Sequence, residues 1–200
     1  MARGVVDHEG MRGEWAEALR QAGRPVGMPF RITRIGHVVL RVTDLERSVG
    51  FYTELLGLEV SDVYPPTMMP GGMVFMRCNT DHHGVALVGG ATGPVRGDEL
   101  HHLAFEVGTL DEVIRARDLL RARDVPIDFE GRRRAGCQIA VEFRDPDGHR
   151  LEIYWGLDQI GSDGRPRSPE QWREALSLAD ALANPPIGQD TTLQDPDLVP

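Results

Sequence analysis

Two adjacent histidine pairs are the first residues in this chain that could do chemistry. His82 and His83 precede the apolar run "GVALVGG", and His101 and His102 precede "LAFEV". An imidazole can ligate a metal ion and can also exchange a proton near neutral pH. A lone histidine at the start of a strand is more often a structural residue, so other donors are needed before a site is indicated.

Two further candidates, His37 and Glu152, lie on strand-like segments of the same kind. Because alternate side chains of a strand point to opposite faces, His37, His102 and Glu152 each fall on the face opposite an apolar row. By the same parity, His82 and His101 are expected to be structural or exposed. Two imidazoles and one carboxylate, with open positions opposite, suit a redox-active or Lewis-acidic divalent metal. The pattern indicates a metal site, with ordinary strand-edge residues as the alternative.

An internal repeat places these residues. The segment "IGHVVLRV" at 35–42 resembles "LHHLAFEV" at 100–107, and the two segments align through a shared histidine. Each leads to a Thr-x-x-Glu capping box, at Thr43 and Thr109, and then to apolar residues at helical spacing. Three short strand-like segments follow each predicted helix. The sequence therefore predicts an α+β fold built from two βαβββ modules.

The repeat divides the chain into a central domain and two flanking extensions. At the C-terminal end, "SPEQ" at 168–171 is typical of a helix start, and we expect that helix to continue through "WREALSLADALA" before an acidic tail. The predicted ranges are 1–30 for an N-terminal helical extension, 31–156 for the domain with modules 31–96 and 97–156, and 157–200 for the C-terminal helix and tail.

Composition excludes several classes of function. The formal charge of -9 argues against a nucleic-acid surface, which needs clustered Lys and Arg. No stretch approaches the roughly 20 apolar residues that span a bilayer, so no membrane partner is expected. The 2 cysteines lie in different segments and do not indicate a disulfide framework. We expect a cytoplasmic protein.

The repeated segments resemble a known superfamily. "IGHVVLRVTDLERSVGFYTELLGLEV", "LHHLAFEV" and "DPDGHRLEIYWG" are similar to the vicinal oxygen chelate superfamily, which includes glyoxalases, bleomycin-resistance proteins and type I extradiol dioxygenases. The resemblance covers about residues 31–156. It implies paired βαβββ modules that form one cup-shaped mixed sheet around a metal. It also implies a homodimer or higher homo-oligomer, because modules of this superfamily often pair across subunits.

Within that superfamily, the segments most resemble the extradiol ring-cleavage dioxygenases. This resemblance implies that His37, His102 and Glu152 hold Fe(II), or else Mn(II). "FMRCNTDHHGVALV" resembles the segment that carries the dioxygenases' catalytic histidine, which implies that His83 is the acid or base. The implied reaction is cleavage of a catecholic aromatic ring with O2 in aromatic catabolism. The expected partners are a small aromatic substrate and O2.

Two positions depart from the dioxygenase pattern. Relatives usually carry a histidine and a tyrosine that contact the substrate, and the matching residues here are Arg133 and Glu142. Arginine could pair with an anionic substrate group, whereas glutamate would repel a catecholate oxygen unless it is protonated. We expect both residues to bind the substrate, together with Tyr154 on the face of Glu152.

Two other functions stay open. One is a metal-dependent lyase or isomerase like the glyoxalases, although the position of the glyoxalase I ligand in the first module is Ala86, which cannot ligate. The other is a non-enzymatic small-molecule-binding protein like the bleomycin-resistance members. Such a binding protein would not be expected to keep the histidine, histidine and glutamate set.

Overall fold

The structure is a computed structural model that describes residues 6–23, 26–27, 29–95, 100–161 and 165–200. The predicted module boundary at 96 and 97 lies outside the described residues, as do positions 1–5, 24–25 and 28 of the N-terminal extension. The elements of the first half are a 3-10 helix at Gly10–Arg12, α1 (Glu14–Arg20), β1 (Val38–Arg41), α2 (Leu45–Glu54), β2 (Glu59–Tyr64), β3 (Met73–Arg77) and β4 (Val85–Val88). Those of the second half are β5 (Leu103–Glu106), α3 (Leu110–Ala122), β6 (Ile127–Arg132), β7 (Ile139–Arg144), β8 (Arg150–Trp155), a 3-10 helix at Pro169–Gln171 and α4 (Leu178–Ala183).

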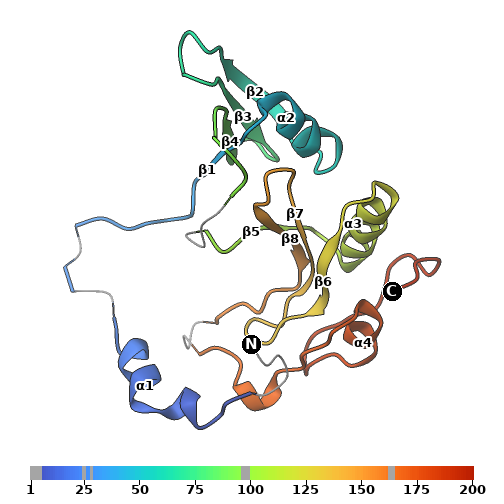
Figure 1. The fold of residues 1–200 in the computed structure, drawn as a ribbon. Helices are drawn as coiled ribbons and strands as arrows, with labels where there is room; N and C mark the ends of the chain where they lie inside the picture. The colour runs from blue at the N-terminus through green and yellow to red at the C-terminus, as the bar shows by residue number, and fades with distance from the viewer. Residues whose placement is uncertain (1–5, 24–25, 28, 96–99, 162–164) are drawn as a thin grey trace.

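Two βαβββ modules lie between the N- and C-terminal segments in the sequence, and Figure 1 draws the first module at the top and the second below it. The first sheet has the strand order β1-β4-β3-β2, and the second has the order β5-β8-β7-β6. In each sheet the first and last strands of the module run parallel, and the other neighbours run antiparallel. The predicted α+β class is therefore confirmed. The strands form two sheets and not one continuous sheet, because among the described strands β1 pairs with β4 alone and β5 with β8 alone.

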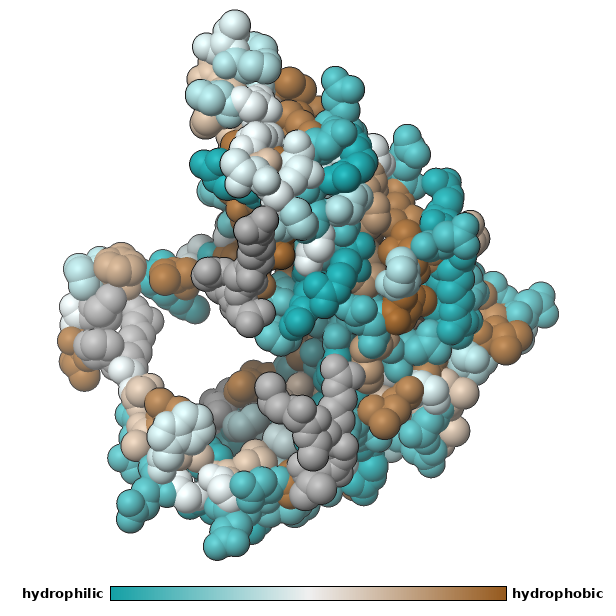
Figure 2. All heavy atoms as spheres, in the orientation of Figure 1, coloured by the Kyte–Doolittle hydropathy of each residue, from teal (hydrophilic) through white to brown (hydrophobic). Residues whose placement is uncertain are grey.

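The apolar faces of both sheets share one core with the two central helices. Leu40 of β1 and Leu151 of β8 are buried in this core, beside Tyr52 of α2 and Val113 of α3. Burying a large apolar side chain contributes about 1.5–3 kcal/mol. The opposite, open faces of the sheets carry the ionisable candidates. On the side of the molecule drawn in Figure 2, polar side chains surround separate patches of apolar ones.

The hairpin turn between β7 and β8 holds the second module against the first. Asp147 in this turn is 2% exposed and accepts hydrogen bonds from Thr43 N and Oγ1, at 2.9 and 2.6 Å. Arg47 Nη2 and Ser48 Oγ donate to its other oxygen, each at 3.0 Å. The four donors belong to the start of α2 and the residues before it. The buried carboxylate of Asp147 therefore helps to join the two modules.

The cap of α2 differs from the prediction. Asp44, and not Thr43, is the N-cap residue, and its side chain accepts the amide of the residue three positions later. The prediction of Thr43 was wrong because its hydroxyl donates to Asp147, an acceptor 104 residues away that a local pattern cannot reveal. The second capping box is confirmed, since Thr109 and Glu112 each accept a hydrogen bond from the other's backbone amide.

The C-terminal segment is not the single helix that was predicted from Ser168 onward. One turn of 3-10 helix is followed, after a gap, by α4, which is capped by Ser177. In the gap, Arg132 N donates to Ala175 O at 2.9 Å, and Ala175 N donates to Arg132 O at 3.2 Å. These backbone groups pair across the chain with the end of β6. They are therefore not available to a continuous helix.

Arg132 also holds the C-terminal segment through its side chain, which is fully buried. Nε donates to Gln189 Oε1 at 2.9 Å, and Nη1 donates to Asn184 O at 2.9 Å. Nη2 donates to Ala181 O. Burial lowers the pKa of Arg132. The side chain of Arg132 thus ties the end of β6 to residues 181–189 of the C-terminal segment.

The acidic tail lies along α3 and is ordered there. Asp111 of α3 accepts the backbone amides of Gln194 and Asp195 at 3.0 and 2.8 Å. Arg115 forms an ion pair with Asp195 at 2.9 Å. Within the described part of the chain, none of the helices is long and apolar enough to cross a bilayer.

Candidate functional site

The first module places His37 and His83 together on the open face of its sheet. Their ring centroids lie 4.6 Å apart, and His83 also packs edge-on against Phe75 of β3, with centroids 5.0 Å apart. His82 is exposed, and its Nδ1 lies 3.0 Å from Nδ1 of His83. Burial, followed by the neighbouring His37 and His82, lowers the pKa of His83. A ring that is neutral at pH 7 can accept a proton.

The second module pairs His102 with Glu152. Nε2 of His102 lies 3.2 Å from Oε2 of Glu152, and the exposed fractions of the two side chains are 42% and 3%. Gln138 donates to the other carboxylate oxygen at 3.4 Å, while its own Oε1 is buried without a hydrogen-bond partner. Burial is the largest cause of the raised pKa of Glu152, and the hydrogen bond from Gln138 acts against it. The buried carboxylate therefore lacks a strong cationic partner.

The two pairs do not meet within one chain. Among the described residues, no group of three or more His, Cys, Asp or Glu side chains could hold a metal ion. The physical reason lies in the sheets: His37 precedes β1 and His102 precedes β5, and these two edge strands are not hydrogen-bonded to each other. A divalent transition metal takes at least three protein ligands in such sites. One chain by itself therefore does not fit the metal, and the predicted set is present as two halves.

Two of the predicted substrate residues pair with each other on the second sheet. Arg133 Nε donates to Glu142 Oε1 at 2.6 Å, and Nη2 donates to the same oxygen. Glu142 lies directly opposite Glu152 in the register of β7 and β8. The ion pair neutralises the glutamate that was expected to repel a catecholate. Both residues stay next to the His102 and Glu152 pair.

Tyr154, the third predicted substrate residue, lies on β8 two residues after Glu152. It lines a cavity of about 650 Å³ between the modules, together with Ile35, Cys78, Phe105 and Glu106. Burial is the largest cause of the raised pKa of Tyr154, with smaller effects from Glu106 and Glu152. None of the proposed metal donors lines this cavity. Tyr154 therefore lines this cavity, whereas Arg133 and Glu142 do not.

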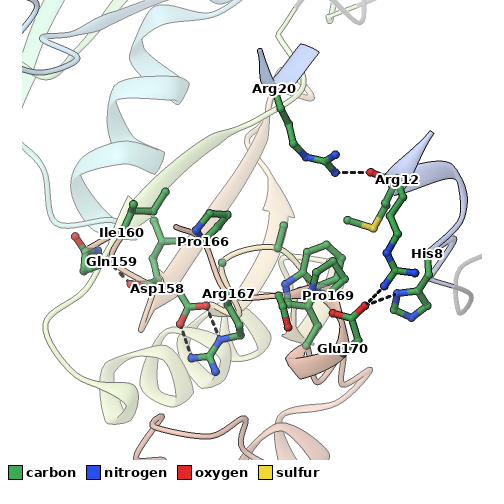
Figure 3. Close-up of a pocket in the computed structure, with 16 residues that line it drawn as sticks. His8, Arg12, Arg20, Asp158, Gln159, Ile160, Pro166, Arg167, Pro169 and Glu170 are labelled. Carbon is green, nitrogen blue, oxygen red and sulfur yellow. Dashed lines mark hydrogen bonds and ion pairs between the residues drawn. The ribbon is translucent and has the colours of Figure 1, made fainter. Parts of the chain in front are cut away.

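A larger cavity of about 780 Å³ lies where the N-terminal segment meets the C-terminal one (Figure 3). His8 and Arg12 approach Glu170, and Arg167 donates to Asp158 at 2.7 and 2.8 Å. None of the site residues predicted from the sequence lines this cavity. Sequence reasoning missed it because its walls come from opposite ends of the chain and share no motif. We therefore place the candidate site at the His37–His83 and His102–Glu152 pairs, because their side chains can bind a metal or a proton, and not at the largest of the described cavities.

Comparisons with known proteins agree on the domain. A family model described as "Glyoxalase/Bleomycin resistance protein/Dioxygenase superfamily" matches residues 34–153. Biphenyl-2,3-diol 1,2-dioxygenase from Paraburkholderia xenovorans (strain LB400) is 31% identical over 144 residues, which are 69% of this chain and 47% of that protein. A manganese-dependent 2,3-dihydroxybiphenyl 1,2-dioxygenase from Geobacillus genomosp. 3 is 27% identical over 152 residues, which are 74% of this chain and 43% of that protein. The chain spans less than half the length of these relatives.

A solved structure supports the fold. The crystal structure of a fosfomycin resistance protein from Listeria monocytogenes matches with a TM-score of 0.53 and 22% sequence identity. The match covers 64% of this chain and 96% of that protein. At this identity the likeness concerns the arrangement of the two βαβββ modules and not the reaction.

Proposed function

We propose that this chain, which belongs to the Glyoxalase/Bleomycin resistance protein/Dioxygenase superfamily, is a metal-dependent extradiol-type dioxygenase that cleaves a catecholic ring with O2. Relatives named as dioxygenases of dihydroxylated aromatic compounds support this, and one of them is manganese-dependent. The observation that carries the proposal is the Glu152 carboxylate, which is 3% exposed and lies 3.2 Å from His102. A carboxylate buried in this way needs a cation or a proton.

Each candidate residue has a role in this proposal. His37, His102 and Glu152 are the proposed ligands, with Fe(II) as the first candidate metal and Mn(II) as the second. Such a metal, when bound, would supply charge stabilisation and redox capacity. His83 would accept a proton from a substrate hydroxyl at its neutral ring and later return it. The proposed substrate contacts are Arg133, Glu142 and Tyr154.

A second copy of the chain is the proposed source of the missing half of the site. The two halves lie beside β1 and β5, and both strands are sheet edges whose backbone groups can meet another chain. The buried hydrogen bonds of Asp145 and Asp147 hold the modules of one chain in an arrangement in which the halves do not meet. In a two-fold dimer, each copy would give His37 to one site and His102 with Glu152 to the other. We therefore propose a cytoplasmic homodimer with two equivalent sites.

The first experiment measures the bound metal and the reaction together. The protein is purified without oxygen, its metal is identified and counted by mass spectrometry, and O2 uptake is followed with catechol and 2,3-dihydroxybiphenyl. We expect close to one iron or manganese per chain, together with ring cleavage. His102→Ala should lose the metal, whereas His8→Ala, at the distant cavity, should retain it.

Other outcomes would redirect the proposal. Zinc or nickel without O2 uptake would favour a lyase or isomerase on the same fold. A protein that binds no metal, even after reconstitution with Fe(II) or Mn(II), would rule out the proposed ligand set and leave a small-molecule-binding protein.

A further inference from the structure

One row of side chains crosses the open face of the second sheet. The strand register places Phe129 of β6 opposite Glu142 of β7, Glu142 opposite Glu152 of β8, and Glu152 opposite Ala104 of β5. Neighbouring strands lie about 4.8 Å apart, so Glu142 lies about one strand spacing from the proposed ligand Glu152. This spacing is close to the width of an aromatic ring. A ring bound at His102 and Glu152 can therefore carry a substituent as far as Glu142.

Arg133 lies over this row in a fixed orientation. Nε and Nη2 both donate to Glu142 Oε1, and the guanidinium carbon lies 3.6 Å from the centroid of the Phe129 ring. The carboxylate fixes one edge of the guanidinium, and the aromatic ring covers one of its faces. The Arg133 side chain is 27% exposed, and Nη1 has no acceptor within hydrogen-bond distance among the described residues. The guanidinium therefore has a fixed orientation, and some of its N–H groups have no acceptor among the described residues.

An oriented guanidinium with unused N–H groups is suited to an anionic ligand. Arginine binds carboxylates through two parallel N–H groups, and a charge-assisted hydrogen bond of this kind is about twice as strong as a neutral one. Glu142 occupies Nε and one hydrogen of Nη2, which leaves the outer edge of the guanidinium for a ligand. Glu142 and Glu152 both repel an anion, so the anion has to bind at the Nη1 and Nη2 edge of the guanidinium, which Glu142 does not occupy.

We propose that Arg133, oriented by Glu142 and Phe129, is a specificity-determining residue that selects catecholic substrates with an anionic substituent on the ring. This inference rests on the proposed dioxygenase function and names its substrate class. The position at which the resemblance to dioxygenases implies a histidine would here bind a carboxylate.

The test compares two probes on the metal-loaded protein, catechol and 3,4-dihydroxybenzoate. The quantity measured is the ratio of kcat/KM for the carboxylated probe to kcat/KM for catechol. We expect the wild-type ratio to exceed one and Arg133→Met to lower it by about tenfold or more, because a charge-assisted hydrogen bond is lost. Arg133→Lys should keep part of the preference, since it keeps the charge without the planar guanidinium.

Two further variants make the test specific. Glu142→Gln keeps an acceptor oxygen that can orient Arg133 but removes the competing negative charge, so it should raise the ratio, opposite in sign to Arg133→Met. Arg121→Met removes another arginine from an ion pair, the one with Glu130, and should leave the ratio unchanged. A wild-type protein that prefers catechol, or a ratio that Arg133→Met does not change, would overturn the inference.

Failure of the proposed function can be told apart from failure of this inference. If neither probe is cleaved, the dioxygenase proposal fails. The ratio of the two dissociation constants, measured by calorimetry on the same variants, then tests Arg133 alone. Tighter binding of 3,4-dihydroxybenzoate that is lost in Arg133→Met would still support recognition of the anion, and equal binding of both probes would reject it.

Discussion

His83 differs from the other paired histidines in what surrounds its ring. It contacts His37 and Phe75, whereas His82 and His101 are exposed. The pKa of His83 is lowered by burial and by its histidine neighbours, so its ring is predominantly neutral at pH 7. Among these histidines, His83 is therefore the best suited to accept a proton from a bound substrate.

The acid–base role of His83 predicts a selective loss of activity. His83→Gln keeps a polar side chain of similar reach but cannot take up a proton. We expect kcat to fall by about 10²- to 10⁴-fold, with metal content and unfolding temperature unchanged. Steady-state kinetics and metal analysis check this, with His82→Gln as the neighbouring control. Equal losses in both variants would mean that His83 has no special role.

The sequence predicted the position of a side chain correctly where that position depends on the strands of a single sheet. The parity of "LHHLAFEV" and "RLEIYWG" placed His102 and Glu152 on the open faces of their strands. In the structure, the parallel register of β5 and β8 puts these two residues next to each other. Parity could not show that His37 lies apart from them. The position of one sheet relative to the other depends on contacts between modules, which a single strand does not encode.

At the scale of elements, the turn between β7 and β8 decides how the modules join. Burial alone would raise the pKa of Asp147, but hydrogen bonds from Thr43, Ser48 and Arg47 outweigh it and hold the pKa below its usual value. An unfolded chain binds this proton near pH 3.9. The folded protein binds the proton only at lower pH, so this contribution to stability is complete above about pH 5. It is lost as the pH falls through the folded pKa.

Removal of this carboxylate should therefore weaken the junction in a pH-dependent way. Asp147→Asn is expected to lower the free energy of unfolding at pH 7 by about 1–3 kcal/mol, and by less at pH 3. Urea unfolding monitored by circular dichroism at both pH values measures the difference. Asp128→Asn breaks a half-exposed ion pair with Arg144 and should cost less than about 1 kcal/mol. A loss that is the same at both pH values would contradict this role of Asp147.

Element prediction was accurate where the signals are local. The strands and helices of both modules follow apolar spacing and turn residues that lie within each segment. The capping residue of α2 and the helix expected from Ser168 were wrong for one reason. In both cases a distant partner, Asp147 or Arg132, takes the polar group that the local pattern assigned to the helix. Competition of this kind can be seen only after the chain has folded.

At the scale of the whole molecule, the proposed dimer has sites that are shared between two copies. It can therefore recover activity from two inactive variants, which a chain with a complete site of its own cannot do. His37→Ala and His102→Ala should each be inactive by themselves. A mixed dimer of the two variants rebuilds one intact site, from His37 of one copy and His102 with Glu152 of the other. Random mixing should therefore restore about one quarter of the wild-type sites. Co-expression with two affinity tags, followed by O2-uptake assays, measures this, and no recovery in purified mixed dimers would place each site within one chain.

The C-terminal segment gives a prediction about the stability of the whole chain. Arg132→Met keeps most of the side-chain volume but leaves the carbonyl oxygens of Ala181 and Asn184 without their donor. We expect the free energy of unfolding to fall by about 2–4 kcal/mol and cleavage by a protease near α4 to become faster. Arg121→Met, at a partly exposed ion pair, is the control. An unchanged midpoint in urea would show that Arg132 does not anchor the segment.

The hydrogen bonds of Arg132 also leave the part of the chain that the family model matches. That model matches residues 34–153, yet the oxygen atoms that accept from this buried cation belong to Ala181, Asn184 and Gln189. A fragment that ends at residue 153 would lose these acceptors together with the residues that cover Arg132. A domain trimmed to the matched residues is therefore expected to be less stable than the full chain, by at least the amount that Arg132→Met costs.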